Sequence, residues 1–259
     1  MIILLFIIAT SLIHGVEVGN PSHPRFFKKG IFTKKNYFKF QAGYLYSNIY
    51  KTKYEDEIIT ETSKDSFFNL KMDSAILSFN FKNRLDIYGI LGNSSFNIDR
   101  EIKTDKSFSW GTGLKLLFFH KKKFFLAVDG KYFKTKQKLN NFFINKKIFT
   151  IEFSRFGFLY EELQGSIAIS YKISPFFPYI GASYLYSTIT PYPGNKGLIR
   201  YPYPNQDIID DFICSKIKNK KNFGLVIGAA INNKNGISIN LESRFFDQNA
   251  INVSGEIRF

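Results

Sequence analysis

Three histidines, His14, His23 and His120, are the side chains of this 259-residue chain best suited to moving protons near neutral pH. Hydrolases, acyltransferases and proteases generally need a histidine beside a nucleophile or a carboxylate. His14 falls in an apolar leader, His23 follows it closely, and His120 sits in a basic turn, so none is expected on a strand at an exposed rim. The sequence has no phosphate-binding glycine loop, HExxH or paired CxxC motif. We therefore predict no enzymatic activity, no cofactor and no metal site.

The carboxylates offer no catalytic pair either. Glu161 and Glu162 are adjacent, so on a strand their side chains point to opposite faces. Glu242 and Arg244 are two positions apart and share a face, which predicts an ion pair. Basic and aromatic residues interleave over 131–143, a pattern found in nucleic-acid-binding proteins, but the exported start of the chain argues against such a partner.

The elements that position these residues are strands. The last nine residues, 251–259, alternate apolar and polar side chains up to the terminal Phe259. The same period of two recurs in 37–50, 74–81, 85–91, 108–118, 124–132, 162–172, 179–186, 223–231 and 237–244. Segments of about 9 to 11 residues suit tilted strands that cross a bilayer. We predict an all-β fold, an antiparallel transmembrane β-barrel of the outer-membrane type, with an even number of about 10 to 12 strands. A hairpin within 148–158 would raise the count to twelve.

The end of the chain has a predicted role of its own. A terminal aromatic residue closing an alternating strand is typical of outer-membrane barrels, so Phe259 is the expected assembly signal for the barrel assembly machinery. The strand around 38–46 is its expected neighbour across the seam. An edge strand of a soluble sandwich is the alternative for this segment taken alone.

Composition agrees with a barrel and with export. The chain has 30 Phe and 15 Tyr, yet charged residues are 22% and the mean hydropathy is −0.14. Lumen-facing polar residues average against lipid-facing apolar ones in a barrel. The apolar run over 1–13 predicts a signal peptide at 1–15, with an uncleaved anchor as the alternative. Residues 16–36 then form a periplasmic segment and 37–259 the barrel, located in the outer membrane.

Connection lengths predict the orientation. Joins near 83, 121, 174 and 234 are short, whereas 51–68, 99–106, 138–158 and 191–220 are long. Outer-membrane barrels keep short turns in the periplasm and long loops outside. The longest loop, 191–220, is Pro-rich and either functional or merely mobile. Cys214 is the single cysteine, so no intramolecular disulfide forms, and it is expected to be a small buried hydrophobe.

Charged residues divide between the predicted lumen and the loops. The lumen-facing set has six positive and five negative members: Lys39, Lys115, Lys131, Lys172, Arg244 and Arg258 with Asp86, Asp129, Glu162, Glu242 and Glu256. The formal charge of +15 therefore arises from turns and loops. We expect at most a weak anion preference, with loop lysines meeting outer-membrane lipid and the phosphates of lipopolysaccharide. Apolar inner positions such as Ile76, Leu117 and Phe133 could plug the lumen.

Several stretches, in the same order, resemble the chlamydial major outer membrane porin family. They are VGNPSHP at 18–24, RLDIY at 84–88, FSW at 108–110, YEELQ at 160–164, PYIG at 178–181, GLVIGA at 224–229 and VSGEIRF at 253–259. The resemblance spans most of the mature chain and implies a trimeric porin that passes small solutes. Two departures are the lone Cys214, where the family is cysteine-rich, and the shorter chain.

Two functions follow as expectations. The first is a porin-like channel for passive diffusion of small hydrophilic solutes. The alternative is a non-conducting outer-membrane barrel with a structural or adhesive role, and an extracellular soluble β-protein is a distant third. A barrel of only ten strands has little lumen left once its side chains fill it, which limits the pore in the first case.

Overall fold

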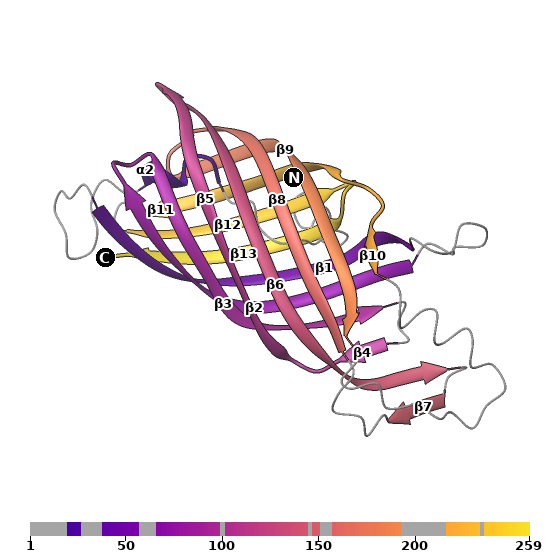
Figure 1. The fold of residues 1–259 in the computed structure, drawn as a ribbon. Helices are drawn as coiled ribbons and strands as arrows, with labels where there is room; N and C mark the ends of the chain where they lie inside the picture. Colours follow the sequence, from indigo (N-terminus) through magenta and orange to yellow (C-terminus); the bar gives the residue numbers. More distant parts are fainter. Residues whose placement is uncertain are drawn as a thin grey trace, which may run out of the picture.

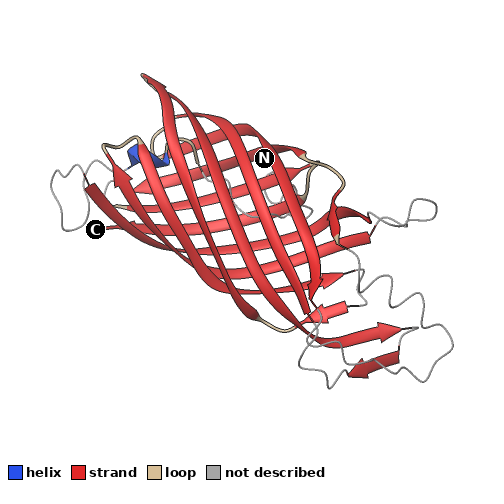
Figure 2. Cartoon of the chain, in the orientation of Figure 1, coloured by secondary structure: helices blue, strands red, loops and turns tan. Residues whose placement is uncertain are grey.

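Strands make up nearly all of the described chain (Figure 2). The computed structural model describes residues 20–26, 38–56, 66–98, 102–144, 147–150, 157–192, 216–233 and 236–259. The predicted signal peptide, Cys214 and residues 193–215 of the Pro-rich loop lie outside these ranges. Within the ranges, no helix is long and apolar enough to cross a membrane.

Ten long strands form a closed antiparallel barrel in which each pairs with its neighbours in sequence (Figure 1). They are β1 (Phe38–Asp56), β2 (Ser66–Phe81), β3 (Leu85–Ile98), β5 (Ser107–Lys121), β6 (Phe124–Ile144), β8 (Gly157–Tyr171), β9 (Phe176–Tyr192), β11 (Phe223–Asn233), β12 (Ile237–Phe245) and β13 (Asn249–Arg258). The predicted all-β barrel with an even strand count is confirmed. The seam is also as predicted, since β13 pairs with β1 from Arg258 opposite Gln41 to Asn249 opposite Lys51.

The barrel has two different ends, which we call the turn end and the loop end. The turn end carries the short connections 82–84, 122–123 and 172–175, the C-terminus and the short helix α2 (His23–Phe26), and the loop end carries β4, β7 and β10 (Figure 1). β4 covers Ile102–Thr104, β7 Lys147–Thr150 and β10 Ile217–Asn219. β7 pairs only with β6 among the described strands, so the hairpin expected near 148–158 adds no strand to the barrel.

Several strands continue past the predicted boundaries at the loop end. β6 has 21 residues, about twice the length that a membrane crossing needs. The period of two persists there, but the outer side chains change from apolar to charged after Tyr132. A strand predicted from its apolar face alone therefore ends at the edge of the membrane, whereas the backbone hydrogen bonds between the strands continue beyond it.

The ring narrows at the loop end. There β10 pairs with both β9 and β1, beyond the ends of β11, β12 and β13, and β4 joins β3 to β6 beyond the end of β5. The pairings close a path through β1, β2, β3, β4, β6, β8, β9 and β10, which is eight strands instead of ten. An interior of about eight strands is just wide enough to be filled by side chains.

An apolar belt surrounds the outside, with aromatic residues toward both edges. Exposed aromatics near the turn end include Phe38, Phe79, Phe118, Phe124 and Tyr171, and those nearer the loop end include Tyr44, Trp110, Tyr184, Tyr186 and Phe223. Phe38 and Phe118 are each 71% exposed within this belt, and a contiguous exposed apolar surface of this kind marks a contact with lipid or with another protein.

Candidate functional site: the filled interior

The predicted lumen residues converge on the barrel interior, with one difference. Buried there are Lys39, Asp86, Lys115, Asp129, Lys131, Glu162, Glu242, Arg244, Glu256 and Arg258. Lys172 instead follows the last residue of β8 and is exposed, with its Nζ 5.7 Å from the centre of the Phe177 ring. The period of two assigns a face only while the strand lasts, and β8 ends at Tyr171.

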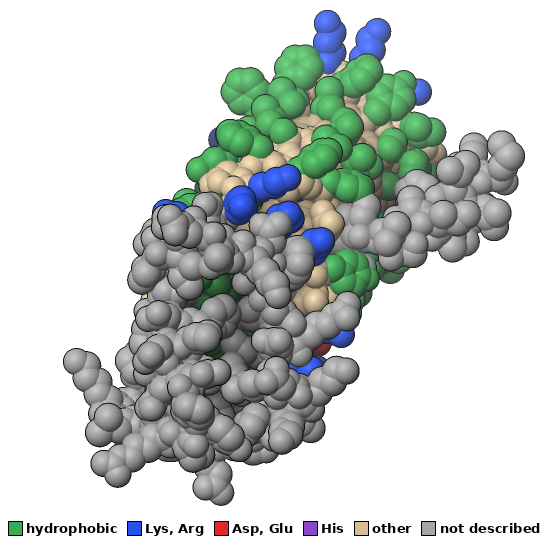
Figure 3. Space-filling model, turned by 90° about the vertical axis from the view of Figure 1, so that its right-hand side faces the viewer, with side chains coloured by type: hydrophobic (Ala, Val, Ile, Leu, Met, Phe, Trp, Pro, Cys, Tyr) green, Lys and Arg blue, Asp and Glu red, His purple; other side chains and the backbone are tan. Residues whose placement is uncertain are grey.

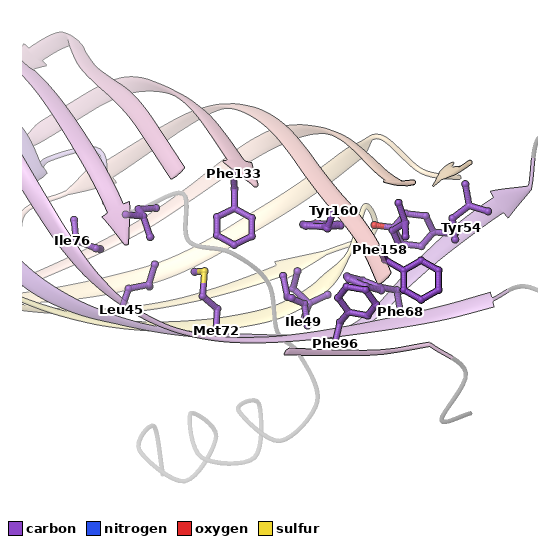
Figure 4. Packing of buried hydrophobic residues seen from close by; sticks show 14 residues of the cluster. Leu45, Ile49, Tyr54, Phe68, Met72, Ile76, Phe96, Phe133, Phe158 and Tyr160 are labelled. Atoms are coloured by element: carbon purple, nitrogen blue, oxygen red, sulfur yellow. The ribbon is translucent and has the colours of Figure 1, made fainter. Parts of the chain in front are cut away.

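Aromatic and aliphatic side chains fill the loop-end interior. The cluster comprises Leu45, Ile49, Tyr54, Phe68, Leu70, Met72, Ile76, Ile90, Phe96, Phe133, Phe158, Tyr160, Ile189 and Ile217, each at most 8% exposed. Phe68 of β2 stacks on Tyr160 of β8 with ring centroids 5.2 Å apart, and Phe96 packs on Phe68 at the same distance. Figure 4 shows these rings meeting inside the barrel from different strands. Because β2 and β8 lie on nearly opposite sides of the ring, the cluster crosses the interior.

A polar layer follows toward the turn end. Lys131 Nζ lies 3.6 Å from Glu162 Oε1 with both side chains fully buried, and Lys115 Nζ lies 3.9 Å from Asp129 Oδ2. Tyrosines complete the carboxylate contacts. The hydroxyl of Tyr160 donates to Glu162 at 2.6 Å, and that of Tyr88 donates to Asp129 at 3.0 Å. Buried charges are tolerated only when they are paired and hydrogen-bonded in this way.

Arg244 has contacts that the sequence did not predict. It forms an ion pair with Asp247 and also donates to Gln164 of β8 and Ser183 of β9. Glu242, the predicted partner, accepts a hydrogen bond from the Tyr179 hydroxyl at 2.8 Å. Asp247 belongs to the connection between β12 and β13, which folds back into the interior. Arg244 therefore links three walls of the barrel to this connection.

The turn-end interior is occupied by the start of the described chain. Asn20, Ser22 and His23 are buried although this segment precedes the first strand. Asn20 Nδ2 donates to the carbonyl of Phe177 at 2.8 Å, and Asn80 Nδ2 donates to the carbonyl of Pro24 at 3.1 Å. We call residues 20–26 the plug segment. This segment is predicted to be periplasmic, and in the structure it lies inside the barrel end that carries the short turns.

His23 fastens the plug segment to two strands. Its Nδ1 lies 2.9 Å from Asp86 Oδ2 on β3, and its Nε2 lies 3.1 Å from Glu256 Oε2 on β13. Burial alone would lower the pKa of this imidazole, but the charges of Glu256 and Asp86 outweigh burial and raise it to about 9. The imidazole is therefore protonated at neutral pH and bridges two carboxylates.

A small cavity separates the plug segment from the aromatic cluster. It is lined by Asn20 and His23 on one side and by Leu45, Ile76 and Ile90 on the other, and its volume is about 40 Å³. That space holds a few water molecules, since each needs roughly 10 to 15 Å³ on this measure. This cavity thus has room for water and none for a sugar or an amino acid.

The buried charges nearly cancel. Among the described residues, five Lys or Arg side chains and six Asp or Glu side chains are buried, and protonated His23 makes the sum six against six. Lys172 was predicted to be buried but is exposed, whereas Asp247 is buried and was not predicted, so the buried positive charges number five and the negative charges six. Protonated His23 makes the two numbers equal. The interior consequently has no net charge that would favour anions over cations.

Three features of this interior were not foreseen as site residues: His23, Asp247 and the tyrosines that hydrogen-bond carboxylates. For Tyr88 the inner face was readable from the alternation of β3. His23 and Asp247 lie in non-strand segments, where no periodicity assigns a face. Their contacts depend on how the chain folds back across strands that are distant in sequence.

The described interior offers no metal site, because no group of three His, Cys, Asp or Glu side chains is arranged to hold an ion in the described ranges. Neither described histidine lies at the loop end, where it could take part in catalysis. His23 lies in the plug segment and His120 at the turn end, with its ring 4.6 Å from that of Phe125.

Comparison with known proteins finds porin relatives in sequence. No family model matches the chain. It is 22% identical over 212 residues to the major outer membrane porin, serovar H, of Chlamydia trachomatis, with 61% of this chain and 53% of the relative covered. The serovar E porin gives 23% over 211 residues with the same coverage. The chain therefore spans about half the length of the curated relatives it matches.

Among solved structures, similarity extends to the outer membrane protease OmpT of Escherichia coli, with a TM-score of 0.46, 10% identity, and coverage of 85% of this chain and 97% of that one. The β-domain of the Bordetella autotransporter BrkA gives a TM-score of 0.44 at 9% identity, covering 86% and 99%. The closed ten-strand barrel with its apolar belt, together with the porin matches, makes this chain an outer-membrane β-barrel protein that is similar in sequence, over part of its length, to the chlamydial major outer membrane porins.

Proposed function

We propose that this protein is a closed outer-membrane barrel with a structural or adhesive role, and that it is not an enzyme. The observation that carries the proposal is the apolar cluster across the loop end, where Phe68 and Tyr160 stack from nearly opposite walls. A diffusion pore needs a continuous aqueous path, whereas this ring of eight strands is filled with side chains.

The length of the strands supports a role at the cell surface. β1 and β6 have 19 and 21 residues, so both extend well beyond a single membrane crossing of about 9 to 11 residues. With the short turns in the periplasm, these extensions stand outside the membrane. They would place the loop-end parts of these strands where an outside partner can reach them.

A second candidate is passive diffusion of small hydrophilic solutes, favoured by the porin relatives. It requires the plug segment and the aromatic cluster to move aside together. A weak anion preference would then have to come from the loop lysines, because the interior charges balance.

Reconstitution distinguishes the two candidates. Refolded protein, shown to be folded by its heat-modifiable mobility in gel electrophoresis, is inserted into liposomes and planar bilayers. We expect no swelling in small sugars and no stepwise conductance in potassium chloride. Reproducible steps from correctly folded protein would establish the channel instead, and the reversal potential across a salt gradient would then measure its selectivity.

A further inference from the structure

The outward-facing side chains of β6 change from apolar or aromatic to lysine between Tyr132 and Lys134. Its inner positions, including Lys131, Phe133 and Thr135, are all buried, so the intervening positions face outward. From the turn end, these outward residues run through Phe124, Leu126, Val128, Gly130 and Tyr132 and then become Lys134, Lys136 and Lys138. Three lysines thus follow the apolar belt in succession, at a spacing of about 7 Å along the strand.

β10 contributes lysines to the same surface. Ile217 and Asn219 point inward and are buried, which leaves Lys216 and Lys218 exposed on the outside. The register connects the two groups, because Lys134 is opposite Glu161, Glu161 is opposite Thr188, and Thr188 is opposite Lys218. With about 4.8 Å between strands, Lys134 and Lys218 lie on one row roughly 14 Å apart. We call Lys134, Lys136, Lys138, Lys216 and Lys218 the lysine strip.

The strip lies at the height of a lipid head group. Tyr132 and Tyr186 mark the end of the apolar belt, and Tyr132 donates a hydrogen bond to Glu161 at 2.7 Å. Lys134 follows directly, with its Nζ 2.9 Å from Glu161. Aromatic residues of this kind sit at the interface between acyl chains and water. Figure 3 shows Lys and Arg side chains gathered between the hydrophobic surface and the loop end.

The charge of the strip exceeds what its own surface neutralises. Glu161 is the carboxylate that contacts Lys134 and lies within electrostatic reach of Lys216. Glu55 of β1 is opposite Lys218 in the register, so five lysines and two glutamates leave a net charge of +3 on the strip. Lys136 Nζ lies over the Tyr192 ring at 4.2 Å, which orients it along the outer wall.

We propose that the lysine strip binds the phosphate groups of lipid in the outer leaflet, in particular those of the lipid A portion of lipopolysaccharide. A cation row just above an aromatic girdle matches a ligand whose acyl chains lie in the belt and whose phosphates lie at its edge. The proposal is independent of whether the interior conducts.

The test is binding of purified bisphosphorylated lipid A to refolded protein in detergent. The variant is Lys136→Gln/Lys138→Gln/Lys218→Gln, and the matched control is Lys121→Gln/Lys122→Gln/Lys123→Gln, which removes the same charge at the turn end. At about 1 kcal/mol per lysine near a charged lipid surface, we expect the strip variant to bind on the order of 100-fold more weakly and the control to bind like the wild type. Lys→Arg changes at the same three strip positions should preserve binding.

Three outcomes overturn the proposal. They are unchanged affinity in the strip variant, an equal loss in the turn-end control, or equal binding of dephosphorylated lipid A by the wild type. All variants are first checked for heat-modifiable mobility, and because the altered lysines are exposed, the barrel is expected to fold.

Discussion

The ring of Phe68 on β2 lies parallel to that of Tyr160 on β8, with an interplanar angle of 19° and centroids 5.2 Å apart. These strands are separated by β3, β5 and β6 along one side of the barrel. Because these two rings come from nearly opposite strands and still stack, the barrel must be narrow at the loop end.

Truncating this pair should open the loop end. In Phe68→Ala/Tyr160→Ala combined with His23→Gln, which loosens the plug segment, we expect ion conductance above that of the wild type, measured in planar bilayers, because neither end of the interior is then fully closed. Each truncation should also lower the free energy of unfolding by about 3 to 5 kcal/mol. Phe118→Ala is the control, since that ring is 71% exposed on the lipid-facing surface. If this variant folds and conducts no more than the wild type, the remaining interior side chains close the barrel without these rings and without the His23 contacts.

The contacts of His23 with Asp86 and Glu256, which we call the His23 clamp, should make the stability of the folded protein depend on pH. The pKa of His23 rises from 6.5 to about 9 in the folded protein, so the protonated clamp stabilises fully below pH 6.5 and loses this contribution as pH rises through 9. The difference corresponds to about 3 kcal/mol. We expect His23→Gln to be less stable than the wild type at pH 6 in urea unfolding, with the gap closing near pH 10. His120→Gln should lack this pH dependence, and a gap for His23→Gln that is equal at both pH values would argue against the clamp.

β6 and β8 carry two comparable ion pairs. Lys131 and Glu162 form one inside the barrel, and Lys134 and Glu161 form the other on the outside. Lys131→Met leaves a buried carboxylate without its cation and should cost about 3 to 5 kcal/mol. Lys134→Met removes a half-exposed pair and should cost about 1 kcal/mol or less.

For both Lys131→Met and Lys134→Met, unfolding is followed by the fluorescence of Trp110, the single tryptophan. The double variant Lys131→Met/Glu162→Gln should regain part of the loss, because the unpaired charge is removed. Equal costs for the inner and outer lysines would mean that water reaches the interior pair.

Deleting Phe259 should impair assembly more than the folded barrel. Its ring is 38% exposed and 6.0 Å from that of Phe40, and its N–H donates to the Phe40 carbonyl at 3.0 Å, so the deletion removes contacts at one end of the seam and leaves the rest of the β13–β1 pairing in place. We expect less heat-modifiable protein in the outer membrane of expressing cells, with unchanged conductance of the barrels that form. Phe246→Ala, which truncates a ring 67% exposed, is the control. Normal assembly of the truncated chain would remove Phe259 from the role of assembly signal.

Much of the wall was predictable from the sequence. A strand exposes alternate residues to opposite sides whatever its neighbours are, so the faces of Lys131, Glu162 and Arg258 follow from parity alone. The pairing of β13 with β1 follows equally, because a barrel of consecutive hairpins must close its last strand on its first. These are local rules, and they end where the strand ends, as Lys172 illustrates.

The state of the interior was decided by tertiary structure. The replacement of ten strands by eight at the loop end depends on β4 and β10 pairing with strands distant in sequence. The insertion of His23 between Asp86 and Glu256 depends on how far the plug segment reaches into the barrel. Alternation states which side chains face inward but not how close opposite walls come. That distance, set by strand number and stagger, determines whether inward residues line a pore or fill it.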